Sequence, residues 1–405
     1  MKIVGSWVQR VRFWWTAGFT LLFLLNLDQF AYSAGLGPAP KYWSMAAFLI
    51  TLLLFVPGFR PEQLLRKPVA WWALGYLLIS VLWLGLADHV ESAIAGLTKV
   101  ITTCLFVGSA LLAYPSVKAF SRSWAAMLWA ALLLATFSIM QEYFNPTAYL
   151  FAEAGQGIPG RAAGLYLNPN TAAQTLVMIL ACLMAHGSAR ANAIALLISM
   201  VGIFLTFSRG GMVAWLVLAV AAAVRGRLHR GLLLAVLGCA AIVLLAGPQV
   251  LDELSVWVAP ENRNSLNRLA WLLGQGDLGD SLSDERAFVA AFAWEQYLEA
   301  PVAGHGLGYM WVWSSDTGAH NQSLRFMVEY GVLGALIFPL FLLASMRSAA
   351  PGADRYWQWL VAGVAMLLSL FSHNLIEQAV FLMPWLAICL ISPAGGTPTQ
   401  SRMSP

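Results

Sequence analysis

The longest polar stretch of the chain decides how the rest is interpreted: residues 251–321 read LDELSVWVAPENRNSLNRLAWLLGQGDLGDSLSDERAFVAAFAWEQYLEAPVAGHGLGYMWVWSSDTGAHN. Apolar runs fill most of the sequence on both sides of it. Arg263, Arg268 and Arg286 lie along the stretch, and His320 stands where the next apolar run begins. This layout predicts a large loop that apolar helices hold at one face of a bilayer.

The composition supports a membrane protein. Of the 405 residues 60% are hydrophobic and only 10% charged, and the mean hydropathy is +0.70. Soluble domains are about 45–50% apolar and about 25% charged. All four cysteines lie within apolar runs, which favours buried thiols over a disulfide framework or a zinc site.

Windows of about 19 residues give twelve apolar runs near the length of a hydrocarbon core. They are 13–31, 42–58, 69–87, 98–116, 124–142, 171–187, 191–208, 211–224, 231–249, 324–346, 356–372 and 379–394. The predicted fold is all-α, a polytopic membrane protein with about twelve transmembrane helices and one large, mainly helical loop outside the membrane. In these terms residues 1–249 hold helices 1–9, 250–322 the loop, 323–394 helices 10–12, and 395–405 a cytoplasmic tail.

The distribution of basic residues predicts the orientation. Of the 23 Lys and Arg residues, 15 fall on the side of the N-terminus and 8 on the other side when the twelve runs alternate. Because cytoplasmic loops carry the excess of Lys and Arg, both termini are expected in the cytoplasm and the long loop on the outer side of the membrane. Nearly every ionisable residue in or next to an apolar run stands at the outer end of that run. These residues are Asp28, Lys99, Glu142, Arg325, Glu329 and Glu377. The pattern argues against a coupled transporter, which has carboxylates near the bilayer midplane.

The long loop itself is expected to be mostly helical. Residues 262–273 have the amphipathic pattern of a helix lying on a membrane surface. A second helix is predicted to start at Ser283, with acidic residues in its first turn, and to end before Pro301. The run Gly304-His305-Gly306-Leu307-Gly308 then predicts turns.

Four outward arginines have no acidic residue at helical spacing: Arg161, Arg209, Arg268 and Arg286. Arg325, by contrast, has Glu329 at i+4, which predicts a local ion pair. Lipid phosphates are one partner for such cations. The alternative is an anionic substrate, because the planar guanidinium binds phosphate oxygens bidentately. The set therefore predicts a site for a lipid-borne diphosphate.

His320 is the candidate general base. Asp316 lies four residues before it and is placed to orient the imidazole, which accepts protons near neutral pH. A structural role is the competing interpretation, and it is favoured for His305 in the glycine-rich turn. His373 is expected to pair with Glu377.

A metal site has weaker support. Asp88, His89 and Glu91 fall in one short segment and form the only metal alternative that the pattern offers. We therefore expect no metal and no cofactor.

One motif resembles a known family. His320-Asn321, nine residues and then Gly331-Val332-Leu333-Gly334 match the signature of the O-antigen ligase family of bacterial membrane glycosyltransferases. Arg268 to Leu272 fits the Arg-x-x-x-Leu pattern of its periplasmic loop, and Arg286 ahead of the 301–308 run resembles a broader pattern shared with polysaccharide polymerases. The segments 160–170 and 208–210 also look like family elements.

The resemblance implies transfer of O-antigen polysaccharide from undecaprenyl diphosphate to a core sugar of lipid A, at the periplasmic face of the inner membrane. It implies His320 and Arg286 as catalytic residues, with Arg161, Arg209 and Arg268 binding the diphosphate. The expected partners are the lipid-linked O-antigen, the lipid A-core oligosaccharide and the bilayer, and no nucleic acid. A polysaccharide polymerase with the same donor is the first alternative, and a flippase for lipid-linked sugars is the second.

Overall fold

The computed structural model describes residues 2–57, 61–145, 161–238, 270, 281–313, 318–372 and 374–391. All regular elements in these ranges are helical, so the all-α prediction is confirmed there. In chain order they are α1 (Lys2–Leu24), α2 (Leu27–Ser33), α3 (Pro40–Phe55), α4 (Pro61–Leu65), α5 (Pro68–Leu84), α6 (Val90–Ala113), η1 (Tyr114–Phe120), α7 (Ser121–Phe144), η3 (Gly164–Tyr166), α8 (Pro169–His186), α9 (Ala189–Leu205), α10 (Arg209–Val224), α13 (Ser281–Glu299), α14 (Met310–Trp313), α15 (Gln322–Tyr330), η5 (Gly331–Leu333), α16 (Gly334–Arg347), α17 (Arg355–Ser369), η6 (Leu375–Glu377) and α18 (Ala379–Leu390).

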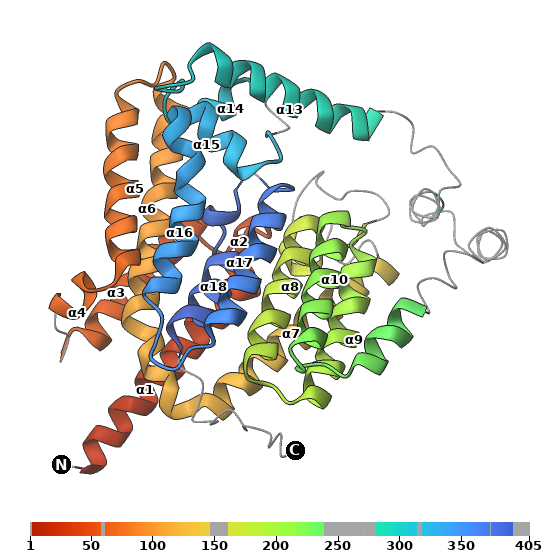
Figure 1. The fold of residues 1–405 in the computed structure, drawn as a ribbon. Coiled ribbons are helices and arrows are strands. Elements are labelled where there is room, and N and C mark those ends of the chain that lie inside the picture. The colour runs from red at the N-terminus through yellow and green to blue at the C-terminus, as the bar shows by residue number, and fades with distance from the viewer. Residues whose placement is uncertain are drawn as a thin grey trace, which may run out of the picture.

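Helices α8 and α18 form the centre of the bundle (Figure 1). Nearly every residue of both is buried, and each packs against several other helices. The indole of Trp357 in α17 donates to the carbonyl oxygen of Ala181 at 3.1 Å, and the thiol of Cys182 donates to that of Pro384 at 3.3 Å. A helix that is apolar on all sides is either buried in a protein core or spans a membrane, and α8 and α18 are buried by the surrounding helices.

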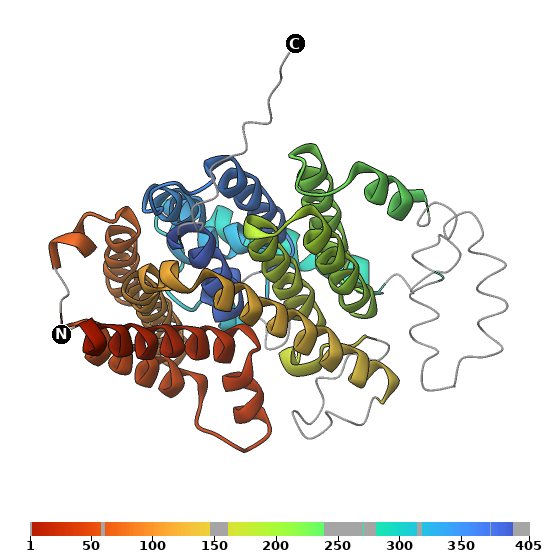
Figure 2. The same ribbon diagram turned by 90° about the horizontal axis from the view of Figure 1, so that it is seen from below.

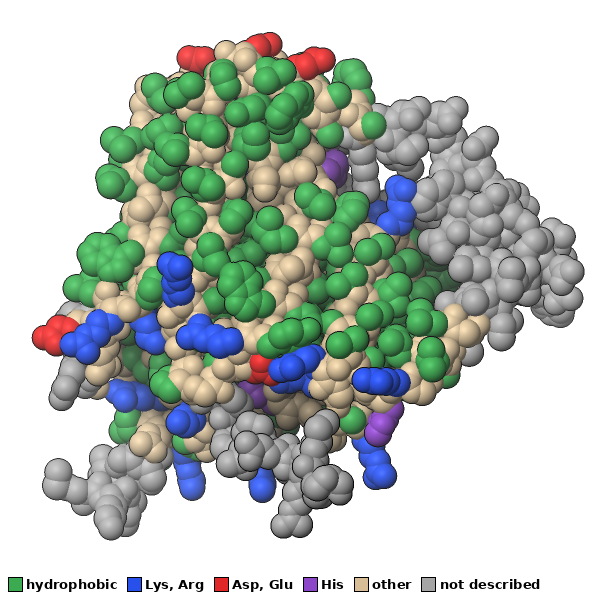
Figure 3. Space-filling view, viewed as in Figure 1, with side chains coloured by type: hydrophobic (Ala, Val, Ile, Leu, Met, Phe, Trp, Pro, Cys, Tyr) green, Lys and Arg blue, Asp and Glu red, His purple; other side chains and the backbone are tan. Residues whose placement is uncertain are grey.

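The outer helices expose large apolar side chains instead of burying them. Leu53, Leu78 and Phe137 are each more than 60% exposed. Figure 3 shows apolar side chains over most of the visible face, with Lys and Arg gathered toward the end where α1 begins. A soluble monomer rarely exposes apolar surface on this scale, which supports a lipid-covered bundle.

The predicted apolar runs coincide with helices wherever the structure describes them, although two of them are interrupted. The run 13–31 is divided between α1 and α2, because Asn26 adopts a left-handed conformation with φ 56°. The run 324–346 is interrupted by the turn at Gly331. The run 231–249 lies mostly outside the described residues.

Among the described residues, two helical stretches are long and apolar enough to cross a membrane, Val90–Phe144 and Gln322–Arg347. Five shorter apolar helices, of 10–17 residues, accompany them: α3, α5, α9, α10 and α18. Twelve spans therefore remain a prediction.

The polar segment contributes α13, which crosses one end of the bundle above α14 and α15 (Figure 1). This helix and its end at Glu299 agree with the helix predicted from Ser283 to before Pro301. The amphipathic segment 262–273 lies outside the described residues apart from residue 270.

The glycine turn after α13 fastens the polar segment to the bundle. The N–H of Gly306 donates to the carbonyl oxygen of Glu329 at 3.1 Å, and the N–H of Leu307 donates to that of Trp83. Gly304 and Gly308 both have φ near 70–80°, and a Cβ at Gly308 would stand 2.3 Å from the Ser92 carbonyl oxygen. Glycine is required here because no side chain fits between the two neighbouring backbones.

Candidate active site

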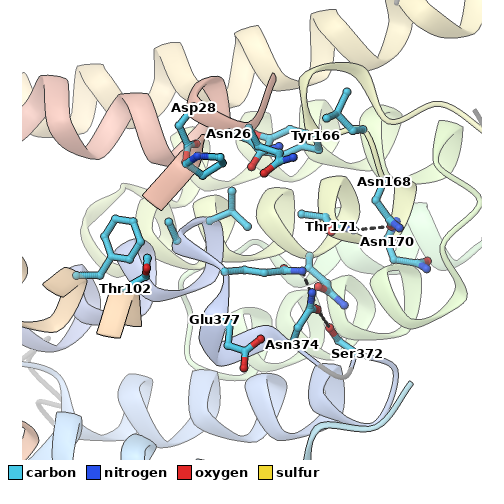
Figure 4. Close-up of a pocket in the computed structure, with 18 of the residues that line it drawn as sticks. Asn26, Asp28, Thr102, Tyr166, Asn168, Asn170, Thr171, Ser372, Asn374 and Glu377 are labelled. Carbon is cyan, nitrogen blue, oxygen red and sulfur yellow. Dashed lines mark hydrogen bonds between the residues drawn. The ribbon is translucent and has the colours of Figure 1, made fainter. Parts of the chain in front are cut away.

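A polar cavity of about 530 Å³ opens where α2, α8 and η6 meet the middle of α6. We call it the His320 cavity, after the histidine that lines it. Asn26, Asp28 and Tyr166 lie on one side and Asn374 and Glu377 on the other (Figure 4). Its described lining consists largely of amide, hydroxyl and carboxylate groups, with no Lys or Arg among those residues.

The start of α8 forms one wall. Asn168 caps the helix, and its Oδ1 accepts hydrogen bonds from the N–H groups of Asn170 at 2.8 Å and Thr171 at 3.3 Å. Pro169 occupies the first turn, where its missing N–H costs nothing. Helix α18 also begins at this cavity, after Gln378. Two helix N-termini with their partial positive charge therefore stand at the cavity.

Arg161 lies beside this wall and is fixed by it. Its Nη2 donates to Asn170 Oδ1 at 2.7 Å, and its Nε donates to the carbonyl oxygen of Thr206 at 2.7 Å. The segment after Arg161 is anchored to α7, because Glu142 Oε2 accepts the N–H groups of Ala163 and Gly164. Arg161 thus contacts a residue that lines the cavity, without lining the cavity itself.

Arg209 is the first residue of α10 and stands next to the same wall. The helix is capped by Ser208, whose hydroxyl also donates to Asn170 Oδ1 at 3.0 Å. A Cβ on Gly210 would stand 3.0 Å from the ring of Phe371, which lines the cavity. The turn at Ser208 thus brings the start of α10 to the cavity.

His320, which lies far along the chain from α8 and immediately before the cap of α15, also lines the cavity. It has φ 48°, a conformation that is uncommon for a residue with a side chain. The next residue, Asn321, caps α15 by accepting the N–H of Leu324 on its Oδ1 at 3.0 Å. This turn presents the imidazole to the cavity immediately before the helix starts.

The spacing in the His-Asn…Gly-x-x-Gly motif has a structural explanation. Its nine intervening residues are the whole of α15. At the far end Gly331 has φ 65°, and a Cβ there would stand 2.1 Å from the carbonyl oxygen of Val302. A Cβ on Gly334 would stand 1.9 Å from that of Phe326. The motif therefore caps one short helix at its start and permits the close turn at its end.

The predicted pair of Arg325 with Glu329 is confirmed, at 3.5 Å, but a closer partner was missed. Arg325 Nη2 lies 2.6 Å from Glu377 Oε1, and Lys99 Nζ lies 3.9 Å from the other oxygen of Glu377. Arg325 is 1% exposed, and the ammonium of Lys99 also stands 3.6 Å from the centre of the Trp311 ring. Buried Arg325, Glu329 and Glu377 and the partly exposed Lys99 thus form a charged cluster that meets the cavity at Glu377.

Sequence analysis missed the neutral polar lining as well. Gln174 is 4% exposed within the apolar helix α8, and its Oε1 has no hydrogen-bond partner in the part of the chain that the structure describes. A buried amide without a partner is costly. An amide in the middle of an otherwise apolar run was the signal that could have found it.

Two other sequence interpretations can be compared with the structure. His305 is structural as expected: its Nε2 lies 2.7 Å from the Gln296 carbonyl oxygen, and its ring stacks on Tyr309. Across the described ranges no group of three or more His, Cys, Asp or Glu residues could hold a metal, so Asp88, His89 and Glu91 do not assemble such a site.

Several expected site residues lie where no side chain is described. Arg268, Asp316 and His373 fall outside the described residues. Arg286 is described only as part of the helix α13. The roles expected of these four remain predictions.

A comparison with protein families identifies residues 194–338, which match the family described as O-Antigen ligase. The match runs from α9 into α16 and contains Arg209, His320 and both motif glycines. No curated protein matches the chain. The resemblance carried by the motif from His320 to Gly334 is therefore confirmed: over residues 194–338 the chain is similar to the O-antigen ligase family.

Proposed function

We propose that this protein transfers O-antigen polysaccharide from undecaprenyl diphosphate to a sugar hydroxyl of lipid A-core, as a ligase of the inner membrane. The observation that carries the proposal is the His320 cavity, whose lining joins His320 to the asparagine that holds Arg161. A base and cations at one cavity are what this transfer requires, because a hydroxyl must lose a proton while a diphosphate leaves.

The proposed orientation puts the His320 cavity at the periplasmic side and both termini in the cytoplasm. The exposed apolar face in Figure 3 supports a multi-pass bundle, and the Lys and Arg side chains gathered near the start of α1 support a cytoplasmic position for that end.

The chemistry divides between the interior and the edge of the cavity. Sugars carry many hydroxyls and no charge, and the amides of Asn26, Gln174 and Asn374 suit them. The diphosphate, by contrast, needs positive charge, which Arg161 and Arg209 supply from beside the start of α8. We therefore place the sugar within the cavity and the diphosphate at its edge.

In the transfer itself, the acceptor oxygen forms a bond to the anomeric carbon of the donor sugar as the bond from that carbon to the diphosphate oxygen breaks. A ring nitrogen of His320 takes the acceptor's proton. The electron pair of the broken bond stays on the diphosphate, where guanidinium groups stabilise it. Arg286 acts with Arg161 and Arg209 in this role, and Arg268 is the further candidate.

The test is a transfer assay with the purified full-length protein, undecaprenyl diphosphate-linked polysaccharide and lipid A-core. Transfer should persist in EDTA, because arginines supply the positive charge. Activity that disappears with EDTA and returns with magnesium or manganese would contradict this mechanism. A protein that moves the lipid-linked sugar across vesicles without forming product would be a flippase.

A deletion strain separates the ligase from a polymerase. Loss of a ligase leaves long polymer on the lipid carrier, whereas loss of a polymerase leaves single repeat units on lipid A-core. The first outcome is expected.

A further inference from the structure

A second cavity, of about 670 Å³, lies at the other end of α6 from its start. The first half of α1, the ends of α3 and α6, the short helix α4 and η1 surround it. Three cations line it, Arg12, Lys67 and Lys118, with no Asp or Glu among its described lining residues. We call it the basic cavity.

Two of the cations are held in place by neutral groups. Arg12 donates from Nε to the carbonyl oxygen of Leu54 at 2.9 Å and from Nη2 to that of Pro57 at 2.8 Å. Lys67 Nζ donates to the carbonyl oxygen of Ser348 at 2.8 Å. Carbonyl oxygens fix the positions of these groups without cancelling their charge. The full positive charge is therefore available to an anion.

Burial makes that charge costly for the protein alone. Lys67 immediately precedes α5, and burial lowers the pKa of its ammonium below the ordinary value. An anion beside it would offset the loss of hydration. Lys118, an exposed residue of η1, also lines the cavity.

The remaining wall is apolar. Phe55, Leu64, Leu111 and Phe120 line the cavity beside the cations. A small hydrated anion would satisfy only the basic part and leave this wall against water. An amphiphile that carries a phosphate next to hydrocarbon covers both parts. Basic pockets between helices on the cytoplasmic side of membrane proteins take such head groups.

We propose that the basic cavity binds an anionic phospholipid of the inner leaflet, with the phosphate among Arg12, Lys67 and Lys118 and the upper acyl chain against Phe55 and Leu64. The assignment to the inner leaflet rests on the proposed membrane orientation. The lipid is a site ligand here and takes no part in the transfer reaction.

Native mass spectrometry of the detergent-purified full-length protein tests this. Phosphatidylglycerol and phosphatidylethanolamine are offered in equal amounts, and retained adducts are counted. Preferential retention of phosphatidylglycerol is expected. Lys118→Glu should weaken it at least fivefold, since one basic residue contributes about a fivefold factor and the substitution also adds repulsion. The matched control is Arg190→Glu, which makes the same charge change at an exposed arginine outside the cavity, and it should leave retention unchanged.

Three results would overturn the proposal: equal retention of the two lipids, equal losses in the two variants, or inorganic phosphate that displaces phosphatidylglycerol at equimolar concentration. The last would identify a site for soluble phosphate. Size-exclusion profiles check that each variant is folded, and Lys67→Gln, which keeps a donor for Ser348, is the second variant.

Failure of the proposed orientation gives a different result. A Lys118→Cys protein whose thiol is labelled only from the periplasm would overturn the inner-leaflet assignment and the orientation while leaving the adduct result intact. Transfer by the Lys118→Glu protein should stay normal, which separates lipid binding from catalysis.

Discussion

The two cavities of this protein are similar in size and opposite in lining. The His320 cavity is lined by amides, hydroxyls and two carboxylates, Asp28 and Glu377, whereas the basic cavity is lined by three cations and apolar side chains. One helix contributes to both: Thr102 and Leu111 of α6 line the first and the second respectively. Cavity volume alone would not distinguish them. The chemistry of the lining indicates a neutral, hydroxyl-rich ligand in one and a lipid phosphate in the other.

The comparison also refines where an anion binds at the active site. If the cavity interior took the diphosphate, cations should line it as they line the basic cavity. Among the described residues they stand beside it instead, at Arg161 and at the start of α10. Substitutions of His320, Arg209 and Gln174 therefore test different parts of one site: the proposed base, the charge at the edge of the cavity and an amide of its interior.

The largest effect is expected at His320. His320→Ala removes the proposed base, and transfer should fall by about 10²–10⁴-fold with little change in KM. The matched control is His229→Ala, an exposed histidine outside the lining of both cavities, and it should leave the rate unchanged. Both are measured in the transfer assay with saturating donor and acceptor. Normal turnover in His320→Ala would remove the cavity from the chemistry.

The next effect concerns stability and tests the carboxylate Glu377, which lines the His320 cavity, whereas no described carboxylate lines the basic cavity. Glu377→Gln leaves the buried Arg325 with less negative charge nearby, and breaking such a pair costs about 3–5 kcal/mol of stability. Lys99→Met is the control, because its ammonium is partly exposed and 3.9 Å from Glu377; it should cost about 1 kcal/mol or less. Thermal unfolding in detergent measures both. Equal melting temperatures for the two variants would mean that the pairing of Arg325 with Glu377 does not stabilise the fold.

Arg209 tests the placement of the leaving group at the edge. Arg209→Ala should lower kcat by about 10²–10³-fold, as removal of one charge-stabilising donor does. Arg190→Ala is the matched control, since it removes an arginine from the first turn of the neighbouring helix α9. Arg209→Lys should recover only part of the rate, because lysine lacks the bidentate fork. Full activity in Arg209→Ala would place the diphosphate elsewhere.

How much of the fold could be predicted from the sequence depends on how far apart along the chain the interacting residues lie. The apolar runs, the glycine turn at 304–308 and the pair Arg325–Glu329 depend on neighbouring residues, and the structure agrees with the sequence there. Glu377 pairs with Arg325 across a separation of 52 positions, which no local pattern reveals. The break of the first run at Asn26 was missed because a single left-handed residue hardly changes mean hydropathy.

The candidate site divides in the same way. His320 was found because the motif around it is local and belongs to one helix with its two ends. The contact of Arg161 with Asn170 joins residues nine apart through a turn, and their proximity to His320 depends on packing of α8 against distant elements. Gln174 and Asp28 carried no motif, so their place in the lining required the structure.

A smaller effect is expected at Gln174, and it tests whether the cavity interior binds sugar. Gln174→Leu should raise the KM for a sugar substrate by about tenfold through the loss of one or two hydrogen bonds, with a smaller change in kcat. Stability should hold or rise, because the amide oxygen has no partner among the described residues. Gln358→Leu replaces another buried glutamine outside the cavity and should leave KM unchanged. An unchanged KM in Gln174→Leu would show that the sugar does not reach α8.

The smallest effect concerns a carboxylate that, unlike Glu377, lies in neither cavity. Asp354 caps α17 through the Trp357 N–H and pairs with Arg227 Nη2 at 2.5 Å. Burial opposes its ionisation, but these two partners outweigh burial and hold the pKa of the carboxyl below its ordinary value of 3.8. A lowered folded-state pKa means that the stabilisation is complete above about pH 4 and is lost as the pH falls through the folded value.

Asp354→Asn should therefore lower stability by about 1 kcal/mol at pH 6, since the pair is partly exposed and the asparagine still caps the helix. Thermal unfolding of both proteins at pH 6 and pH 3 measures the difference, which should shrink at the lower pH as the wild-type carboxylate is protonated. A difference that stays constant with pH would assign the stabilisation to the cap and its packing, and would leave Glu377 as the carboxylate whose charge matters to the fold.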